Sequence, residues 1–176
     1  MDMILETERL YLRAPEPSDF EALCRILQDE EVMYAFEGAF SDEEVRAWIE
    51  RQAERYRSRK LGKWAVVLKE TGEMIGQCGL TLQSWKEREV LEVGYLFARK
   101  CWHRGYATEA AVACKQYAFE TMGADEVCSI IRDTNTASRK VAERNGMTLQ
   151  DSCMREYRGA ERLYVRYAVR RNEAEK

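Results

Sequence analysis

The stretch RKCWHRGYATEA, residues 99–110, has the composition of an anion-binding turn. It follows an apolar run and opens a long helical pattern, and a helix start leaves backbone N–H groups unpaired at the positive end of the helix dipole. Small residues at Gly105 and Ala107 allow a ligand to approach the backbone closely. The cations beside them are Arg99, Lys100 and Arg104. The stretch therefore predicts a pyrophosphate site, with an ordinary helix start carrying solvated arginines as the alternative.

A carboxylate on an apolar strand is the second candidate for chemistry. In residues 89–98, EVLEVGYLFA, strand alternation places Glu92 on one face, beside Gly94. The residues of the opposite face are Leu91, Val93, Tyr95 and Phe97. A carboxylate in such surroundings suits a general base. The alternative is a structural carboxylate paired with a neighbouring arginine.

Cysteine and histidine usage argues against a metal site. The six cysteines occur singly, without a C-x-x-C pair, and His103 is the lone histidine, which together make a poor zinc set. They are Cys24, Cys78, Cys101, Cys114, Cys128 and Cys153. Cys24 and Cys114 fall on apolar stripes of predicted helices, so the thiols are interpreted as small buried side chains in a reducing compartment. We expect no metal.

Length and charge limit the class of protein further. A chain of 176 residues is long enough to bury one core, and we expect a single domain over residues 1–176. The formal net charge of −3 lacks the one-sided basic character that nucleic acid selects. No basic leader and no run of about 20 apolar residues appears, so we expect a cytoplasmic protein without a membrane segment.

Periodicity predicts an alternation of strands and helices. Strand-like runs cover residues 8–13, 63–69, 74–82, 89–98, 126–131, 148–157 and 163–169. Capping boxes at Ser18 with Glu21 and at Ser41 with Glu44 predict two early amphipathic helices. A long helix after Gly105 and a short one over 137–144 follow. The order indicates an α/β fold whose sheet is partly antiparallel.

Residues 99–110 closely resemble the pyrophosphate loop of GNAT acetyltransferases, written as Gln or Arg, two residues, Gly, any residue, then Gly or Ala. Gly105 and Ala107 occupy the small positions, and Trp102 stands where Gln or Arg is usual. Trp in that region followed by GYATEA resembles the Rim-type branch, which acetylates ribosomal-protein N-termini. Further matches in the family's order are the segments 7–13, 18–20, 74–80 and 135–147, so the resemblance spans about residues 7–169.

The resemblance implies a mixed, mostly antiparallel central sheet flanked by helices, with splayed fourth and fifth strands. It also implies direct transfer of an acetyl group from acetyl-CoA to a primary amine, without a covalent enzyme intermediate. By resemblance Glu92 would be the base. Ser138 would stabilise or protonate the departing thiolate, with a role at the start of its helix as the alternative.

Other residues would hold the cosubstrate. By resemblance, the pantetheine arm would lie against Asn135, and a backbone N–H at Tyr95 or Leu96 would meet the oxyanion, helped by the flexibility of Gly94. The expected acetyl-CoA contacts are Tyr95, Leu96, Phe97, Trp102, His103, Arg104, Gly105, Tyr106, Ala107, Thr108 and Asn135.

Two questions stay open at the level of sequence. One alternative to an enzyme is a non-catalytic CoA-binding module of the same fold. Among enzymes, the acceptor could be a protein N-terminus, a polyamine, an aminoglycoside or a small metabolite amine. Aromatic and acidic residues over 34–44 point to a cationic acceptor, although a solvated capping turn explains the acids equally well. A homodimer would be usual for the family.

Overall fold

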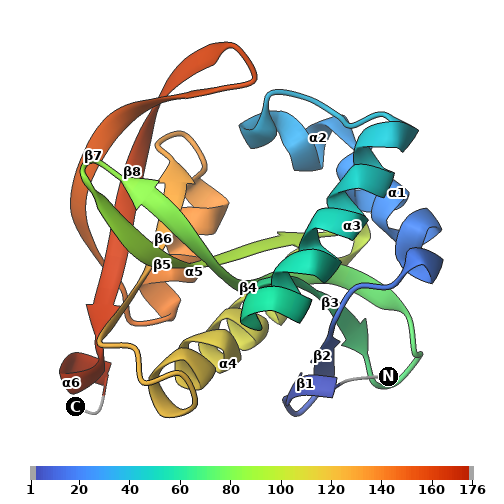
Figure 1. The fold of residues 1–176 in the computed structure, drawn as a ribbon, viewed down its shortest axis with the longest axis horizontal. Helices are drawn as coiled ribbons and strands as arrows, with labels where there is room; N and C mark the ends of the chain where they lie inside the picture. The colour runs from blue at the N-terminus through green and yellow to red at the C-terminus, as the bar shows by residue number, and fades with distance from the viewer. Residues whose placement is uncertain (1–2, 175–176) are drawn as a thin grey trace.

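The protein is built on one twisted eight-stranded sheet, seen in a computed structural model that describes residues 3–174 (Figure 1). The strand order is β1-β2-β3-β4-β5-β6-β8-β7. All neighbours pair antiparallel except β5 and β6, which are parallel. The strands are β1 (Met3–Glu6), β2 (Leu10–Arg13), β3 (Gly62–Leu68), β4 (Met74–Trp85), β5 (Arg88–Phe97), β6 (Glu126–Arg132), β7 (Thr148–Tyr157) and β8 (Ala160–Arg170). The predicted mixed, mostly antiparallel architecture is confirmed.

Helices cover both faces of the sheet. They are α1 (Phe20–Leu27), α2 (Glu30–Met33), α3 (Asp42–Arg59), α4 (Tyr106–Glu120), α5 (Thr136–Arg144) and α6 (Arg171–Ala174). A core that includes Trp64, Val93 and Phe97 packs against α4 and α5, whereas α1 and α3 cover a second core on the opposite face. Leu91 and Tyr95 join the first core, so the predicted face of β5 is confirmed.

The entry into α1 differs from the prediction. Ser18 does not cap the helix, and the N-cap residue is Asp19. The Asp19 carboxylate accepts 2.6 and 2.8 Å hydrogen bonds from the buried Arg13 guanidinium. Asp19 also accepts from the backbone N–H of Glu16, and α1 begins at Phe20. The capping box therefore lies two residues earlier than predicted, between Glu16 and Asp19, and Asp19 is also paired with the buried Arg13.

The second predicted cap is correct. Ser41 Oγ accepts a hydrogen bond from the N–H of Glu44, and the Glu44 carboxylate accepts one from the N–H of Ser41. Three short elements were absent from the prediction, β1, α2 and α6, each of four residues. Segments of that length carry too few positions to show a period.

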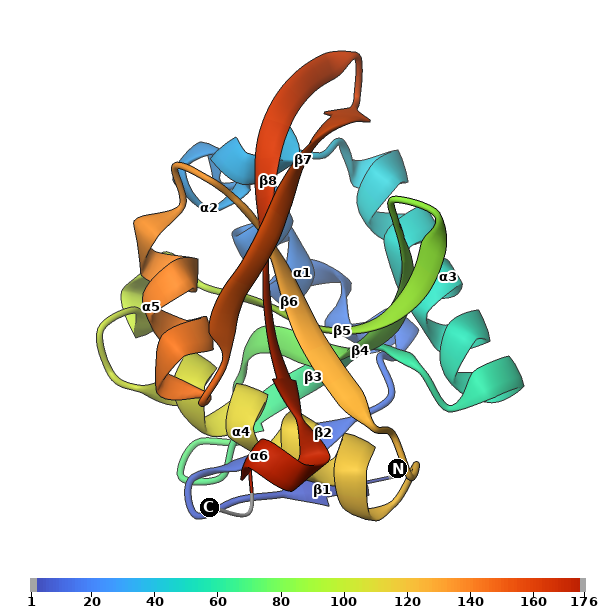
Figure 2. The same ribbon diagram turned by 90° about the vertical axis from the view of Figure 1, so that its left-hand side faces the viewer.

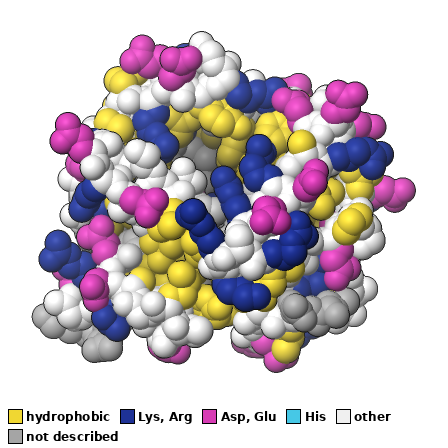
Figure 3. Space-filling view, viewed as in Figure 1, with side chains coloured by type: hydrophobic (Ala, Val, Ile, Leu, Met, Phe, Trp, Pro, Cys, Tyr) yellow, Lys and Arg dark blue, Asp and Glu magenta, His cyan; other side chains and the backbone are white. Residues whose placement is uncertain are grey.

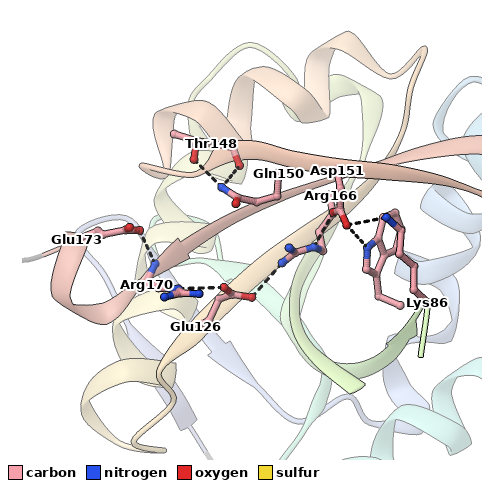
Figure 4. Close-up of polar contacts among 9 residues, drawn as sticks. Lys86, Glu126, Thr148, Gln150, Asp151, Arg166, Arg170 and Glu173 are labelled. Atoms are coloured by element: carbon pink, nitrogen blue, oxygen red, sulfur yellow. Dashed lines mark hydrogen bonds and ion pairs between the residues drawn. The ribbon is translucent and has the colours of Figure 1, made fainter. Parts of the chain in front are cut away.

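The tip of the β4–β5 hairpin is tied to β7 and β8 by a polar network (Figure 4). The Arg166 guanidinium, with only 6% of its side chain exposed, lies 3.0 Å from both Asp151 and Glu126. Asp151 also accepts from the indole N–H of Trp85 and from Lys86. Figure 2 shows the long β7–β8 hairpin beside β6, projecting toward α2. The network fixes the hairpin against the far half of the sheet.

Candidate active site

The turn between β5 and α4 forms an anion cradle. Gly105 is the N-cap of α4 with φ of +80°, and its carbonyl accepts the N–H of Glu109. Within residues 3–174, the N–H groups of Tyr106, Ala107 and Thr108 have no hydrogen-bond acceptor. They lie in the first turn of a 15-residue helix, where the positive end of the dipole favours a phosphate. The cradle fits the pyrophosphate of CoA.

The cations of this turn are distributed differently from the prediction. Arg99 lies 3.1 Å from Asp29 and 2.6 Å from Glu31, and Lys100 lies 2.5 Å from Glu73. Arg99 and Lys100 are therefore ion-paired with carboxylates of other segments and are not free to bind a phosphate. Arg104 makes no ion pair in the described part of the chain and stays exposed beside the cradle. It is the cation that remains for a phosphate.

Trp102 and His103 precede the cradle in the chain, and Trp102 fixes its backbone. The indole N–H of Trp102 donates a 2.9 Å hydrogen bond to the carbonyl oxygen of Phe97, which ties the turn to the end of β5. Trp102 keeps 37% of its surface exposed, and His103, exposed with φ of +61°, lies next to it. Trp102 thus takes a structural position and remains partly exposed to solvent.

Thr7 and Arg9, in the β1–β2 turn, bind Glu109 and support the same cradle; we call these contacts the latch. Glu109 accepts hydrogen bonds from Thr7 Oγ1 at 2.6 Å and from Arg9 Nε at 2.7 Å. Arg9 also donates to the carbonyl of Arg104, and its guanidinium stacks over the Tyr106 ring at 4.5 Å. Burial opposes ionisation of Glu109, but the hydrogen bonds from Thr7 and Arg9 outweigh it and lower its pKa. Sequence reasoning missed this latch because its partners are about 100 residues apart.

The parallel strands β5 and β6 separate just beyond a single bridging pair. Their register contains only Glu92 opposite Cys128. A regular ladder would continue through the Val93 carbonyl, but this oxygen instead accepts a 2.7 Å hydrogen bond from Ser129 Oγ. Ser129, with 2% exposure, is a functional candidate that sequence reasoning missed. The predicted splay of the fourth and fifth strands is present. These strands are β5 and β6 here, because the short strand β1 adds one to the numbering.

The splay exposes a backbone donor of β5. Ala98 donates its N–H to Ile75, so by antiparallel alternation Leu96 also points its N–H toward β4. Tyr95, one residue earlier, points its N–H toward β6, where the ladder is interrupted. Of the two predicted oxyanion donors, Tyr95 therefore has the suitable direction and Leu96 does not.

Tyr95 also connects β5 to the start of α5. Its hydroxyl donates a 2.8 Å hydrogen bond to the carbonyl oxygen of Ser138. Burial raises the pKa of Tyr95 far above its usual value, so this hydroxyl stays protonated as a donor. Asn135 caps α5 by accepting from the N–H of Ser138 at 3.2 Å. The structure thus brings three of the predicted site residues together, and it gives the helix cap to Asn135 rather than to Ser138.

Glu92 lies on the α3 face of the sheet with a cation beside it. Its Oε1 is 3.2 Å from Lys63 Nζ, and each side chain is 13% exposed. The ammonium lies over Gly94, because a Cβ on that glycine would be 1.9 Å from Lys63 Nζ and 2.9 Å from Glu92 Oε1. The structural pairing anticipated for Glu92 therefore exists, with lysine rather than arginine as its partner, and the carboxylate remains partly accessible.

The segment 34–44 borders the β7–β8 hairpin. Glu37 pairs with Arg132 at 3.3 Å and with Arg162 at 3.1 Å, and Glu44 pairs with Arg158 at 3.0 Å. Between segment 34–44 and β6 the surface is hollowed. Apolar side chains form the floor of this hollow, and Lys or Arg side chains surround it (Figure 3). Because Glu37 and Glu44 are already neutralised by arginines, they offer little to a cationic acceptor.

No group of three or more His, Cys, Asp or Glu side chains in residues 3–174 is arranged to hold a metal ion. In the same residues, no helix has both the length and the apolar character needed to cross a bilayer.

The cradle, the strand splay and the capped helix together correspond to a known sequence family. Residues 9–148 match the acetyltransferase (GNAT) domain family. The chain belongs to this GNAT family. It is accordingly an acetyl-CoA-dependent acyltransferase, as the sequence predicted.

The chain is also similar to individual proteins and solved structures. The uncharacterized protein YkkB of Bacillus subtilis is 36% identical over 144 residues, which cover 81% of this chain and 84% of YkkB. A GNAT acetyltransferase structure from Bacillus anthracis is 26% identical, covers 96% of this chain and 98% of its own, and superposes with a TM-score of 0.82. The ribosomal L7/L12 α-N-protein acetyltransferase RimL, solved with coenzyme A, is 20% identical with a TM-score of 0.80. It covers 96% of this chain and 98% of RimL, and at that identity it establishes the fold alone.

Proposed function

We propose that this GNAT enzyme transfers the acetyl group of acetyl-CoA to a primary amine of a protein N-terminus or a small molecule, by direct attack. The observation that carries the proposal is the joint presence of the α4 cradle and the β5–β6 splay, with Glu92 at the bridging pair where the splay begins. A Rim-type specificity is supported by the GYATEA segment, which resembles that branch. The alternative, a non-catalytic CoA-binding module, would need neither a base nor an exposed donor at the splay.

In this reaction acetyl-CoA supplies the acyl group as a thioester. The first-turn N–H groups of Tyr106, Ala107 and Thr108, with Arg104, would hold its pyrophosphate, and the turn atoms of Trp102, His103 and Gly105 would border it. We assign the contacts at the splay to Tyr95, Leu96, Phe97 and Asn135, as the resemblance implies. The Tyr95 N–H would stabilise negative charge that develops on the acetyl oxygen.

Proton transfer would use two side chains. Glu92 would accept a proton from the attacking amine, directly or through water, because it is the carboxylate at the start of the splay. Lys63, 3.2 Å away, would orient that carboxylate before the substrate arrives. Ser138 would donate a proton to the departing thiolate and regain one from solvent water, since its turn is fixed by Tyr95 and Asn135.

We further propose one N-acetyltransferase domain over residues 1–176, supported by the continuous sheet. The six free thiols suit a reducing compartment, and we place the reaction in the cytoplasm. We propose a homodimer only because homodimers are usual in this family.

The test is a thiol-release assay with purified protein, acetyl-CoA and a panel of N-terminal peptides, polyamines, aminoglycosides and metabolite amines. Amine-dependent release of free thiol, with mass spectrometry of the acetylated product, is the expected result. Tight CoA binding without turnover of any amine would favour the binding-module alternative.

A further inference from the structure

A groove separates α3 from the outer halves of β4 and β5. Its lining includes Arg51, Arg55 and Arg59 of α3, Thr81 of β4 and Glu89 of β5. The three arginines recur at every fourth residue, which places them on the same face of the helix. The groove therefore carries a row of guanidinium groups along one wall.

This row has no ion-pair partner in the described part of the chain. Within residues 3–174, none of Arg51, Arg55 and Arg59 forms an ion pair, and Arg51 instead lies over the Trp48 ring at 5.2 Å. Of the two carboxylates in the lining, Glu54 is 2.8 Å from Arg57, and Glu89 is exposed at the outer end. Like charges four residues apart destabilise a helix, so the row costs stability that folding does not require.

Arg55 is the most constrained member of the row. It is partly buried, and this burial together with the positive charge of Arg51 lowers its pKa. A desolvated cation held near a second cation gains when an anion binds between them. The groove is thus prepared for a negatively charged ligand.

The groove leads to the candidate base. Thr81 in its wall is the cross-strand partner of Glu92, and a Cβ on Gly62 would lie 3.7 Å from Arg55 Cβ, next to Lys63. The groove lies on the α3 face, whereas α4, which carries the phosphate cradle, packs on the opposite face. An anion bound here is therefore on the acceptor side of Glu92, away from the cradle.

We propose that this groove binds the acceptor, and that the acceptor is a polypeptide N-terminus with Asp or Glu among its first residues. The inference rests on the proposed N-acetyltransferase function. From Arg51 to Arg59 the helix rises about 12 Å, at about 1.5 Å per residue. An extended peptide covers that length with about four residues, at about 3.4 Å each. A single small carboxylate would occupy one arginine and leave the others unpaired.

The test compares three eight-residue peptides with the same first residue and with Asp/Glu, Asn/Gln or Lys at positions 2 to 4. Each carries a C-terminal fluorophore, and binding in the presence of CoA is measured by anisotropy alongside kcat/KM. The acidic peptide should bind about tenfold more tightly than the neutral one, because two or more charge-assisted contacts are made. The Arg51→Gln, Arg55→Gln double variant should reduce that preference to about twofold or less.

Two further variants serve as controls for this test. Arg57→Gln lies on the same helix, but its side chain pairs with Glu54 and is 65% exposed, so it should keep the preference. Arg55→Glu should turn the preference toward the lysine peptide, which a misfolded protein could not do. Equal binding of all three peptides would overturn the proposal, as would competition by free aspartate or glutamate as strong as that of the acidic peptide.

Binding and turnover separate the two hypotheses. Selective binding without acetylation would contradict the proposed enzyme function and support the groove assignment. Acetylation of all three peptides with equal kcat/KM would support the enzyme function and overturn the groove assignment.

Discussion

Ser129 Oγ donates a 2.7 Å hydrogen bond to the carbonyl oxygen of Val93 at the point where β5 and β6 separate. The hydroxyl replaces the backbone donor that a continuing parallel ladder would supply. Both residues are nearly fully buried, so the bond is protected from water. A side chain therefore maintains the gap that the proposed reaction requires.

Ser129→Ala should destabilise the protein by about 1–3 kcal/mol, because the buried Val93 carbonyl would lose its donor. We also expect a lower kcat, since the Tyr95 N–H would no longer be held in the open splay. Chemical denaturation and steady-state kinetics measure the two effects. Ser152→Ala, at an exposed position of β7, is the matched control and should change neither. Unchanged stability of Ser129→Ala would show that the hydroxyl is dispensable.

Glu92→Gln should lower kcat/KM by on the order of 10²-fold or more, the range usual for loss of a general base. Binding of acetyl-CoA, measured as a thermal shift, should persist, because the cradle lies on another part of the sheet. Glu87→Gln, in the exposed β4–β5 turn, is the control. Wild-type turnover by Glu92→Gln, with an unaltered acidic limb of the pH–rate profile, would assign Glu92 a purely structural pairing with Lys63.

Gly105→Glu should abolish the rise in Tm that saturating acetyl-CoA gives the wild type, because a ligand that binds only the native state stabilises it. The new side chain would bring a negative charge and a Cβ, 3.4 Å from Arg9 Nη2, into the cradle. Gly123→Ala imposes comparable backbone strain, at φ of +69°, on the other end of α4, where a Cβ meets open space. A normal shift in Gly105→Glu would place the cosubstrate elsewhere.

Asp151→Asn should remove an acid-dependent part of stability. Burial opposes its ionisation, but hydrogen bonds from Lys86, Trp85 and Arg166 outweigh this and lower the pKa of Asp151 to about 2. A lowered folded-state pKa stabilises the protein above about pH 4, and the gain is lost between about pH 4 and 2. The variant should lose about 1 kcal/mol at pH 7, after allowance for partial exposure, and show a flatter decline in acid.

The control for this experiment is Asp125→Asn. Its carboxylate pairs with Arg171 but is 93% exposed, so it should leave the pH dependence of unfolding as in the wild type. Parallel urea denaturations at pH 7, 4 and 2.5 make the comparison. Identical slopes of stability against pH for the wild type and Asp151→Asn would refute the role given to the network.

The features predictable from sequence are those that depend on neighbouring residues. The α4 start at Gly105, the Ser41 cap and the alternation that sets Glu92 opposite Val93 each follow from a short pattern, and the structure has all three. Resemblance to the GNAT family supplied the overall sheet and the splay. The reactive roles of Glu92 and Ser138 remain predictions.

The features that sequence did not reveal join distant residues. The Arg9–Glu109 latch, the Lys63–Glu92 pair and the Ser129–Val93 bond connect positions between 29 and 100 residues apart. Such pairs depend on which strands become neighbours, and no local period encodes that. The pairing of Arg99 with Asp29 shows the same effect, since it removed a cation that the local sequence assigned to the pyrophosphate.

The ammonium of Lys63 occupies the space above Gly94, where any Cβ would come within 1.9 Å of it. The two positions are therefore coupled. Because Nζ is the far end of a flexible side chain, a larger residue at 94 should displace the ammonium from Glu92 without excluding lysine at 63. Residue 94 thus limits indirectly which charge can accompany the carboxylate.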